Sequence, residues 1–165
     1  MKAYFDSCAV DAVLEGPYSE ALKARIADGR IDAWVGAEVI SEVAKTPLRS
    51  DRRLRLMSVI GHVIKPAPTN IPIVGGRPAD PTAQFGASKM IWRIVGGPEG
   101  QAMFTALQHL GITKLDAVHL VEAALGNANV FVTTDKEDLL KKSTQITELT
   151  NVRVISPADL LAEAA

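Results

Sequence analysis

The chain has 165 residues, of which 47% are hydrophobic, so it can form one domain with a substantial core, and a disordered or low-complexity protein is excluded. Its 18 Lys and Arg side chains nearly balance 19 Asp and Glu side chains, so net charge gives no reason to expect nucleic-acid binding and any basic surface must be local. The single cysteine excludes a disulfide framework and a cysteine-based zinc cluster. No apolar run is long enough to span a membrane, and the N-terminal segment reaches Asp6 too early for a secretory signal. We therefore expect a soluble, cytoplasmic, single-domain protein.

Short β-rich runs alternate with helical patterns along the chain, which is typical of parallel sheets built from βα units. The first part contains predicted strands at 3–6, 31–36 and 63–65 and predicted helices at 18–28, 37–45 and 51–60. The second part contains predicted helices at 82–95, 98–110, 114–125 and 138–142, strands at 130–133 and 152–155, and a terminal helix that begins at Ser156-Pro157. This order predicts an α/β fold, a three-layer α/β/α sandwich with a parallel sheet of about five strands.

The middle of the chain interrupts this alternation. Residues 66–81 hold five prolines and the pair Gly75-Gly76, a composition that predicts a loop. A helical insertion is predicted to follow at about 82–111. We expect both segments to belong to a single domain that covers residues 1–165.

Four acidic residues stand where predicted strands end or the neighbouring helices begin. Asp6 ends the first strand, Glu42 lies one turn into the helix after the second strand, Asp116 begins the helix before the fourth strand, and Asp135 follows that strand. If the first and fourth strands are neighbours, the carboxylates meet beyond the carboxyl ends of the sheet, where they repel one another unless a hard cation such as Mg²⁺ or Mn²⁺ offsets their charge. Each acid also has a structural alternative, because acids cap helices and stand on exposed helix faces, and Glu38 competes with Glu42.

The four acids lie in segments that together resemble the PIN-domain family, in particular the VapC-type toxin ribonucleases. The segments are Tyr4-Phe5-Asp6-Ser7-Cys8, residues 36–43, Leu115-Asp116-Ala117-Val118-His119-Leu120 and Phe131-Val132-Thr133-Thr134-Asp135. The resemblance selects Glu42 over Glu38 as the second acid. It implies a PIN-like fold and a metal-dependent endoribonuclease that hydrolyses RNA phosphodiester bonds, with Asp6, Glu42, Asp116 and Asp135 as catalytic residues that bind Mg²⁺ or Mn²⁺. It also implies a homodimer, and an antitoxin protein as partner if the chain is the toxin of a type II toxin–antitoxin pair.

Several residues near the acids have more than one interpretation. His119 can act as a general base or ligand, but the apolar residues around it favour a structural histidine, and Cys8 is expected to be a small buried thiol. Ser7 and Thr134 are expected to hydrogen-bond to the metal ligands. Ser7-Cys8 stands where many family members carry Thr-Asn, which supports an alternative function: a catalytically weak or inactive PIN-like module that binds RNA or a protein partner.

Two further surfaces have alternative roles. A basic run can steer a phosphate backbone, although a solvated helix face is the favoured interpretation. An apolar run can pack against a partner subunit or inside the domain. The basic run consists of Lys45, Arg49, Arg52, Arg53 and Arg55, and the apolar run of Met90-Ile91-Trp92 with Ile94 and Val95.

Overall fold

The computed structural model describes residues 1–36, 39–40, 42–43, 50–66 and 97–165. Of the predicted loop at 66–81, only Pro66 is described, and it ends a strand instead. The rest of that loop lies outside the described residues and stays a prediction, as do the helix at 82–95, Glu38, Lys45, Arg49 and the apolar run around Met90-Ile91-Trp92. In the described part of the chain, no helix is both long and apolar enough to cross a membrane.

A five-stranded parallel sheet forms the centre of the molecule. Its strands are β1 (Lys2–Phe5), β2 (Asp32–Val35), β3 (Lys65–Pro66), β4 (Val130–Val132) and β5 (Arg153–Ile155). Their order is β3-β2-β1-β4-β5, and every neighbouring pair is parallel. The predicted parallel sheet is confirmed. The chain builds the sheet outward from β1 in one direction and then returns to add β4 on the other side.

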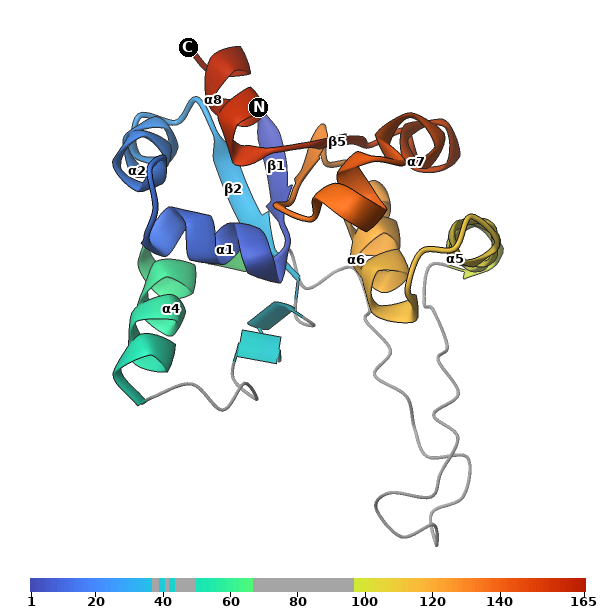
Figure 1. The fold of residues 1–165 in the computed structure, drawn as a ribbon, viewed down its shortest axis with the longest axis horizontal. Coiled ribbons are helices and arrows are strands. Elements are labelled where there is room, and N and C mark those ends of the chain that lie inside the picture. Colours follow the sequence, from blue (N-terminus) through green and yellow to red (C-terminus); the bar gives the residue numbers. More distant parts are fainter. Residues whose placement is uncertain (37–38, 41, 44–49, 67–96) are drawn as a thin grey trace, which may run out of the picture.

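Helices cover both faces of this sheet, which confirms the predicted three-layer sandwich (Figure 1). One layer contains α1 (Ser7–Leu14), α2 (Ser19–Ala27) and α4 (Ser50–His62). The opposite layer contains α5 (Gly97–His109), α6 (Lys114–Leu125) and α7 (Ser143–Thr150). The last helix, α8 (Pro157–Glu163), contacts α2. Between β2 and α4, residues 39–40 and 42–43 are helical.

The central strands are apolar because both faces of the sheet are covered. Ala3, Tyr4 and Phe5 of β1 are all fully buried, as are the three residues of β4. A strand covered on both faces needs a continuous apolar run instead of an alternating one. The tyrosine ring stacks on Phe131 of the neighbouring strand, with the ring centroids 5.4 Å apart.

Two helices were not predicted from the sequence. Helix α1 begins directly after Asp6, whose carboxylate accepts a hydrogen bond from the Ser7 backbone N–H and caps the helix. Helix α7 has the sequence STQITELT, in which Ser and Thr have weak helix propensity. Burial of Ile146 against the core stabilises it instead. The helix predicted at 138–142 is a single π-helical turn, η1 (Lys136–Leu140).

A buried polar pair lies between the sheet and α6. The Tyr4 hydroxyl donates to Glu122 Oε2 over 2.6 Å, and the glutamate is 3% exposed. Gly36, directly after β2, packs against this pair so closely that a Cβ atom there would overlap both Glu122 Oε2 and the Tyr4 hydroxyl. A glycine is therefore required at position 36 for the pair to fit.

We expect Gly36→Ala to lower the free energy of unfolding by about 1–3 kcal/mol, because the methyl group overpacks a buried contact. Gly61→Ala is the matched control, since Gly61 lies in α4 with open space around its Cα. It should leave stability unchanged or raise it by about 0.5–1 kcal/mol. Urea denaturation of both variants measures this, and equal effects at the two positions would contradict the close contact at Gly36.

Candidate metal centre

The candidate site lies where the order of the strands reverses, between β1 and β4. Asp6 directly follows β1 and Thr133 directly follows β4. The Asp6 backbone N–H donates to the Val132 carbonyl over 3.0 Å, so the two strand ends are held side by side. In open parallel sheets this is the position at which ligands bind.

Asp6 is held firmly in place. Its side chain is almost completely buried, and the residue is 5% exposed. Oδ1 accepts the Ser7 backbone N–H at 2.7 Å, and Oδ2 accepts the Cys8 thiol and the Thr133 hydroxyl, each at 3.0 Å. The carboxylate therefore has little freedom to rotate.

Helix α6 brings two further ligand atoms to Asp6. Thr113 caps the helix, and its hydroxyl also donates to Asp116 Oδ2 over 2.5 Å. His119 follows one turn later, is 1% exposed, and places Nδ1 3.5 Å from Asp6 Oδ1. Asp6, Asp116 and His119 each offer one ligand atom, and these atoms all lie within 4.8 Å of one another.

Glu42 and Asp135 lie at the edge of this group. Glu42 is half-buried, and its charge acts on the pKa of His119, while the charges of Asp6 and Asp116 act on its own. Asp135 acts electrostatically on Asp116, although its Oδ1 also caps η1 by accepting the backbone N–H groups of residues 137 and 138, each at 3.0 Å. All four predicted acids are thus within electrostatic reach of the site, and their role as metal ligands stays a prediction.

The carboxylates destabilise one another. Burial raises the pKa of Asp116, and the Asp6 and Asp135 charges raise it further. Burial likewise raises the pKa of Glu42, to which the charges of Asp6 and Asp116 add. A centre with this much negative charge favours a cation.

His119 compensates part of this charge, chiefly that of Asp6. Burial raises the pKa of Asp6, but His119 and the hydrogen bonds from Cys8 and Thr133 outweigh it, so the Asp6 pKa lies below its usual value. Burial lowers the pKa of His119, but Asp6 and the other nearby carboxylates outweigh it and hold the His119 pKa above its usual value. The histidine and the buried aspartate therefore form a pair of opposite sign at the centre.

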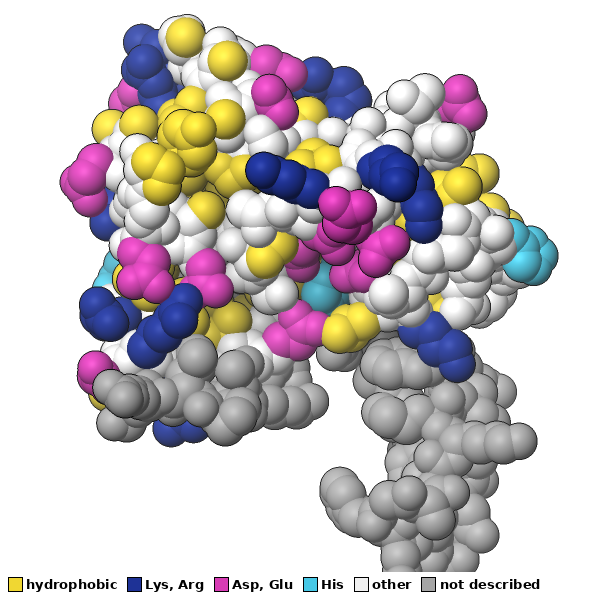
Figure 2. Space-filling model, in the orientation of Figure 1, with side chains coloured by type: hydrophobic (Ala, Val, Ile, Leu, Met, Phe, Trp, Pro, Cys, Tyr) yellow, Lys and Arg dark blue, Asp and Glu magenta, His cyan; other side chains and the backbone are white. Residues whose placement is uncertain are grey.

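Figure 2 shows acidic side chains gathered around a recessed histidine ring on this face, with Lys and Arg side chains nearby. Lys114 and Lys136 are exposed and directly flank the acidic positions, two residues before Asp116 and one residue after Asp135. Of the predicted basic run, Arg52 instead pairs with Asp11 and Glu15, at 3.1 and 2.9 Å.

The structure locates three neighbours of the acids, and two of them, Cys8 and Thr134, differ from the sequence predictions. His119 is buried, as expected of a structural histidine, but it faces Asp6 and belongs to the candidate ligand set. The sequence indicates this through the spacing of three residues between Asp116 and His119, because that spacing places both side chains on one helix face. Cys8 is only partly buried and hydrogen-bonds to Asp6. The hydroxyl on Asp6 comes from Thr133, whereas the exposed Thr134 contacts Cys8 through its backbone N–H.

The donor set fits a divalent cation. With metal–oxygen distances of about 2.1 Å, ligands of an octahedral ion lie about 3 Å apart when adjacent and about 4.2 Å apart when opposite. The three ligand atoms lie within 4.8 Å of one another, so a small movement of the side chains would bring them around one ion. Two carboxylates suit Mg²⁺ or Mn²⁺, and an imidazole nitrogen favours Mn²⁺ or another transition metal over Mg²⁺. The buried His119 ring places Nδ1 3.5 Å from Asp6 Oδ1, so it faces the carboxylates from inside the centre.

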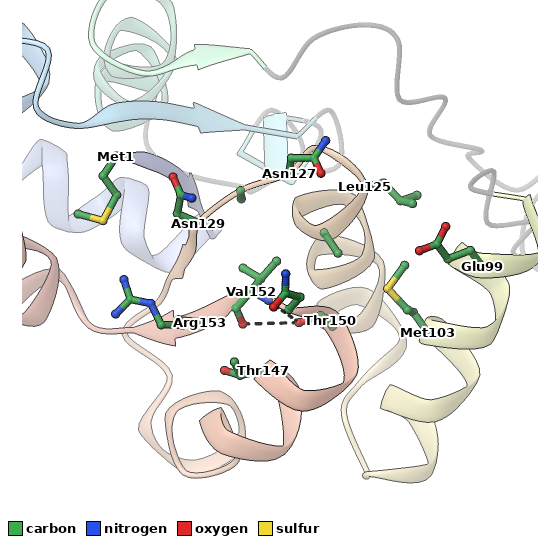
Figure 3. A pocket seen from close by; sticks show the side chains of 13 residues that line it. Met1, Glu99, Met103, Leu125, Asn127, Asn129, Thr147, Thr150, Val152 and Arg153 are labelled. Carbon is green, nitrogen blue, oxygen red and sulfur yellow. Dashed lines mark hydrogen bonds between the residues drawn. The ribbon is translucent and has the colours of Figure 1, made fainter.

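A separate cavity of about 890 Å³ lies at the amino-terminal ends of the strands (Figure 3). Met1, Asn129 and Val152, which immediately precede β1, β4 and β5, contribute to its lining, together with residues of α5 and α7. None of the four predicted acids lines it. The candidate metal centre is therefore a different feature, at the opposite ends of the same strands.

Comparison with known proteins shows a shared fold. No protein-family model matches the chain, and no curated protein sequence matches it. A chain in the crystal structure of VapBC2 from Rickettsia felis, bound to a DNA fragment from its promoter, is similar in structure, with a TM-score of 0.56. The two chains share a fold. They are 12% identical, and the match covers 94% of this chain and 98% of the other. The architecture thus agrees with the PIN-like fold that the sequence predicts.

Two substitutions at the centre should have opposite effects on stability at pH 7 in EDTA. The Asp6 pKa is lowered in the fold, so its charge stabilises the protein, and Asp6→Asn should lower the free energy of unfolding by about 1–3 kcal/mol. The Asp116 pKa is raised, so its charge is unfavourable at neutral pH, and Asp116→Asn should raise Tm by about 1–3 °C.

The pH dependence follows from the same signs. The gain from Asp116→Asn should disappear as the pH falls through the raised pKa of Asp116, where the wild-type carboxyl also becomes neutral. The loss from Asp6→Asn should persist to lower pH and vanish only through the lowered pKa of Asp6. Thermal denaturation from about pH 2 to about pH 8 measures both. A destabilised Asp116→Asn variant at pH 7 would contradict the charge repulsion described above.

Proposed function

We propose that the protein is a metal-dependent endoribonuclease of the PIN type. The observation that carries this proposal is the convergence of Asp6, Asp116 and His119 at the reversal point of a parallel sheet. Glu42 and Asp135 lie within electrostatic reach of the same centre. Such a cluster of carboxylates is suited to a phosphodiester reaction that needs a cation at the phosphate.

In this proposal Asp6, Glu42, Asp116 and Asp135 hold Mg²⁺ or Mn²⁺, and His119 adds a nitrogen ligand or a compensating charge. A bound divalent cation would polarise the scissile phosphate and activate water for attack on it. The chain's own residues set the geometry. Asp6 is fixed by three hydrogen bonds, and Thr113 orients Asp116 at the start of α6.

RNA is the proposed substrate, and exposed lysines support a polyanion at this face. Lys114 and Lys136 lie next to the acidic positions on the two sides of the centre, at the starts of α6 and η1. Cations placed beside the acids attract the flanking phosphates and reduce the repulsion that the carboxylates exert on the backbone. The carboxylates of the centre itself would hold the cation, and the cation would face the reacting phosphate.

The proposed context is a toxin–antitoxin pair. The structural neighbour comes from a VapBC2 complex bound to promoter DNA, which supports an antitoxin protein as the partner of this chain. By resemblance to VapC-type proteins we also expect a homodimer that acts in the cytoplasm.

A binding module without turnover is the second candidate. Cys8 supports it, because the residue stands where many PIN domains carry a different side chain and it contacts Asp6 directly. In this case RNA or a protein partner is held at the same face, and no cleavage follows.

We expect the protein to cleave labelled single-stranded RNA oligonucleotides in the presence of Mn²⁺ and to lose this activity in EDTA. Asp116→Asn should reduce the rate by more than about 100-fold, since loss of an outer partner of a metal ligand alone costs 10- to 100-fold. This variant is preferred to Asp6→Asn because it is expected to stay folded. Glu137→Gln, which changes an exposed acid two residues after Asp135, is the matched control and should leave the rate unchanged.

Gel electrophoresis of the products separates the candidates. Cleavage that survives both EDTA and Asp116→Asn would contradict the metal-dependent mechanism. RNA that is retained on the protein in a mobility-shift assay but never cut, with or without Mn²⁺, would favour the binding module.

A further inference from the structure

Two side chains donate hydrogen bonds to the same oxygen of Asp6. The Cys8 thiol and the Thr133 hydroxyl each lie 3.0 Å from Asp6 Oδ2. They come from opposite sides of the strand reversal, because Cys8 is in the first turn of α1 and Thr133 follows β4. The two donors are also in contact with each other, with Sγ and Oγ1 3.3 Å apart.

These donors and the Ser7 backbone N–H leave Asp6 with one lone-pair site that none of them uses. A carboxylate offers about four lone-pair sites, two on each oxygen. The thiol and the hydroxyl fill both sites on Oδ2, and the Ser7 backbone N–H at 2.7 Å fills one on Oδ1. The remaining site is on Oδ1, the oxygen that lies 3.5 Å from His119 Nδ1.

We propose that Cys8 is a positioning residue that restricts Asp6 to one-oxygen binding of the metal through Oδ1. This inference rests on the proposed function, because it describes how a ligand of the same centre is oriented. Without the thiol, Oδ2 has a vacant site, and the carboxylate can turn or bind the ion through both oxygens. This change in the orientation of the Asp6 carboxylate alters both the affinity of the centre for the ion and the geometry in which the ion is bound.

The other contacts of Cys8 agree with this role. Its Sγ accepts the Thr134 backbone N–H at 3.3 Å, so the thiol joins α1 to the segment between β4 and η1. The Thr133 hydroxyl accepts the Asp135 backbone N–H at 3.1 Å in the same way. Cys8 is only partly buried, so filling the core is not its main contribution. A thiol is protonated at neutral pH and can donate to the carboxylate.

The test is titration of the full chain with Mn²⁺ by calorimetry, together with electron paramagnetic resonance of the bound ion. Cys8→Ala removes the donor, and we expect the Mn²⁺ dissociation constant to rise about 10-fold and the zero-field splitting of Mn²⁺ to change. Cys8→Ser keeps a donor at nearly the same place and should stay within about 3-fold of wild type with an unchanged spectrum. Thr133→Val removes the other donor on Oδ2 and should resemble Cys8→Ala.

The outcomes distinguish this inference from the proposed function. If wild type binds Mn²⁺ and Cys8→Ala binds it with the same affinity and spectrum, the positioning role is wrong while the metal centre stands. If Cys8→Ala and Cys8→Ser weaken binding equally, the thiol acts through packing and the positioning role is again wrong. If wild type binds no Mn²⁺ while urea denaturation shows that it is folded, both proposals fail.

Discussion

The parallel pairing of β1 with β4 is the interaction on which the rest of the site depends. These strands are distant in sequence, and their hydrogen bonds bring Asp6 beside Thr133. The Asp6 backbone joins the sheet through the Val132 carbonyl, while its side chain caps α1 and accepts side-chain donors from both segments. A single residue therefore ends a strand, starts a helix and supplies the most buried carboxylate of the candidate centre. Helix α6 packs against the same strand pair and adds Asp116 and His119.

This arrangement concentrates negative charge around one buried carboxylate, Asp6, and its partly buried neighbours. The raised pKa values of Asp116 and Glu42 report the cost of that concentration, and the lowered pKa of Asp6 reports how strongly its donors and His119 hold it. Proteins maintain such unfavourable groups at functional sites, where a ligand repays the cost. The cavity at the other end of the strands has no comparable set of acids, which is why the carboxyl ends are the better candidate for chemistry.

The sequence alone predicted most of the framework, because apolar strands and capped helices are local patterns. The strand at Val130–Val132 and the helix at Lys114–Leu125 follow from such patterns. Helices α1 and α7 did not, since α1 starts without a break after a strand and α7 depends on burial of Ile146, which is a tertiary effect. At the site, the acids were recognisable by their order. The contacts of Thr133 and His119 with Asp6 join residues more than 100 positions apart, and no local pattern encodes them.

The most direct test of the central claim is a crystal structure of the protein soaked in Mn²⁺, with anomalous diffraction data collected to locate the ion. We expect an anomalous peak between Asp6 Oδ1 and the Asp116 carboxylate, at about 2.0–2.3 Å from each, with His119 beside it. A saturating soak that gives no peak at the carboxyl ends of β1 and β4, or a peak only on unrelated surface carboxylates, would contradict it.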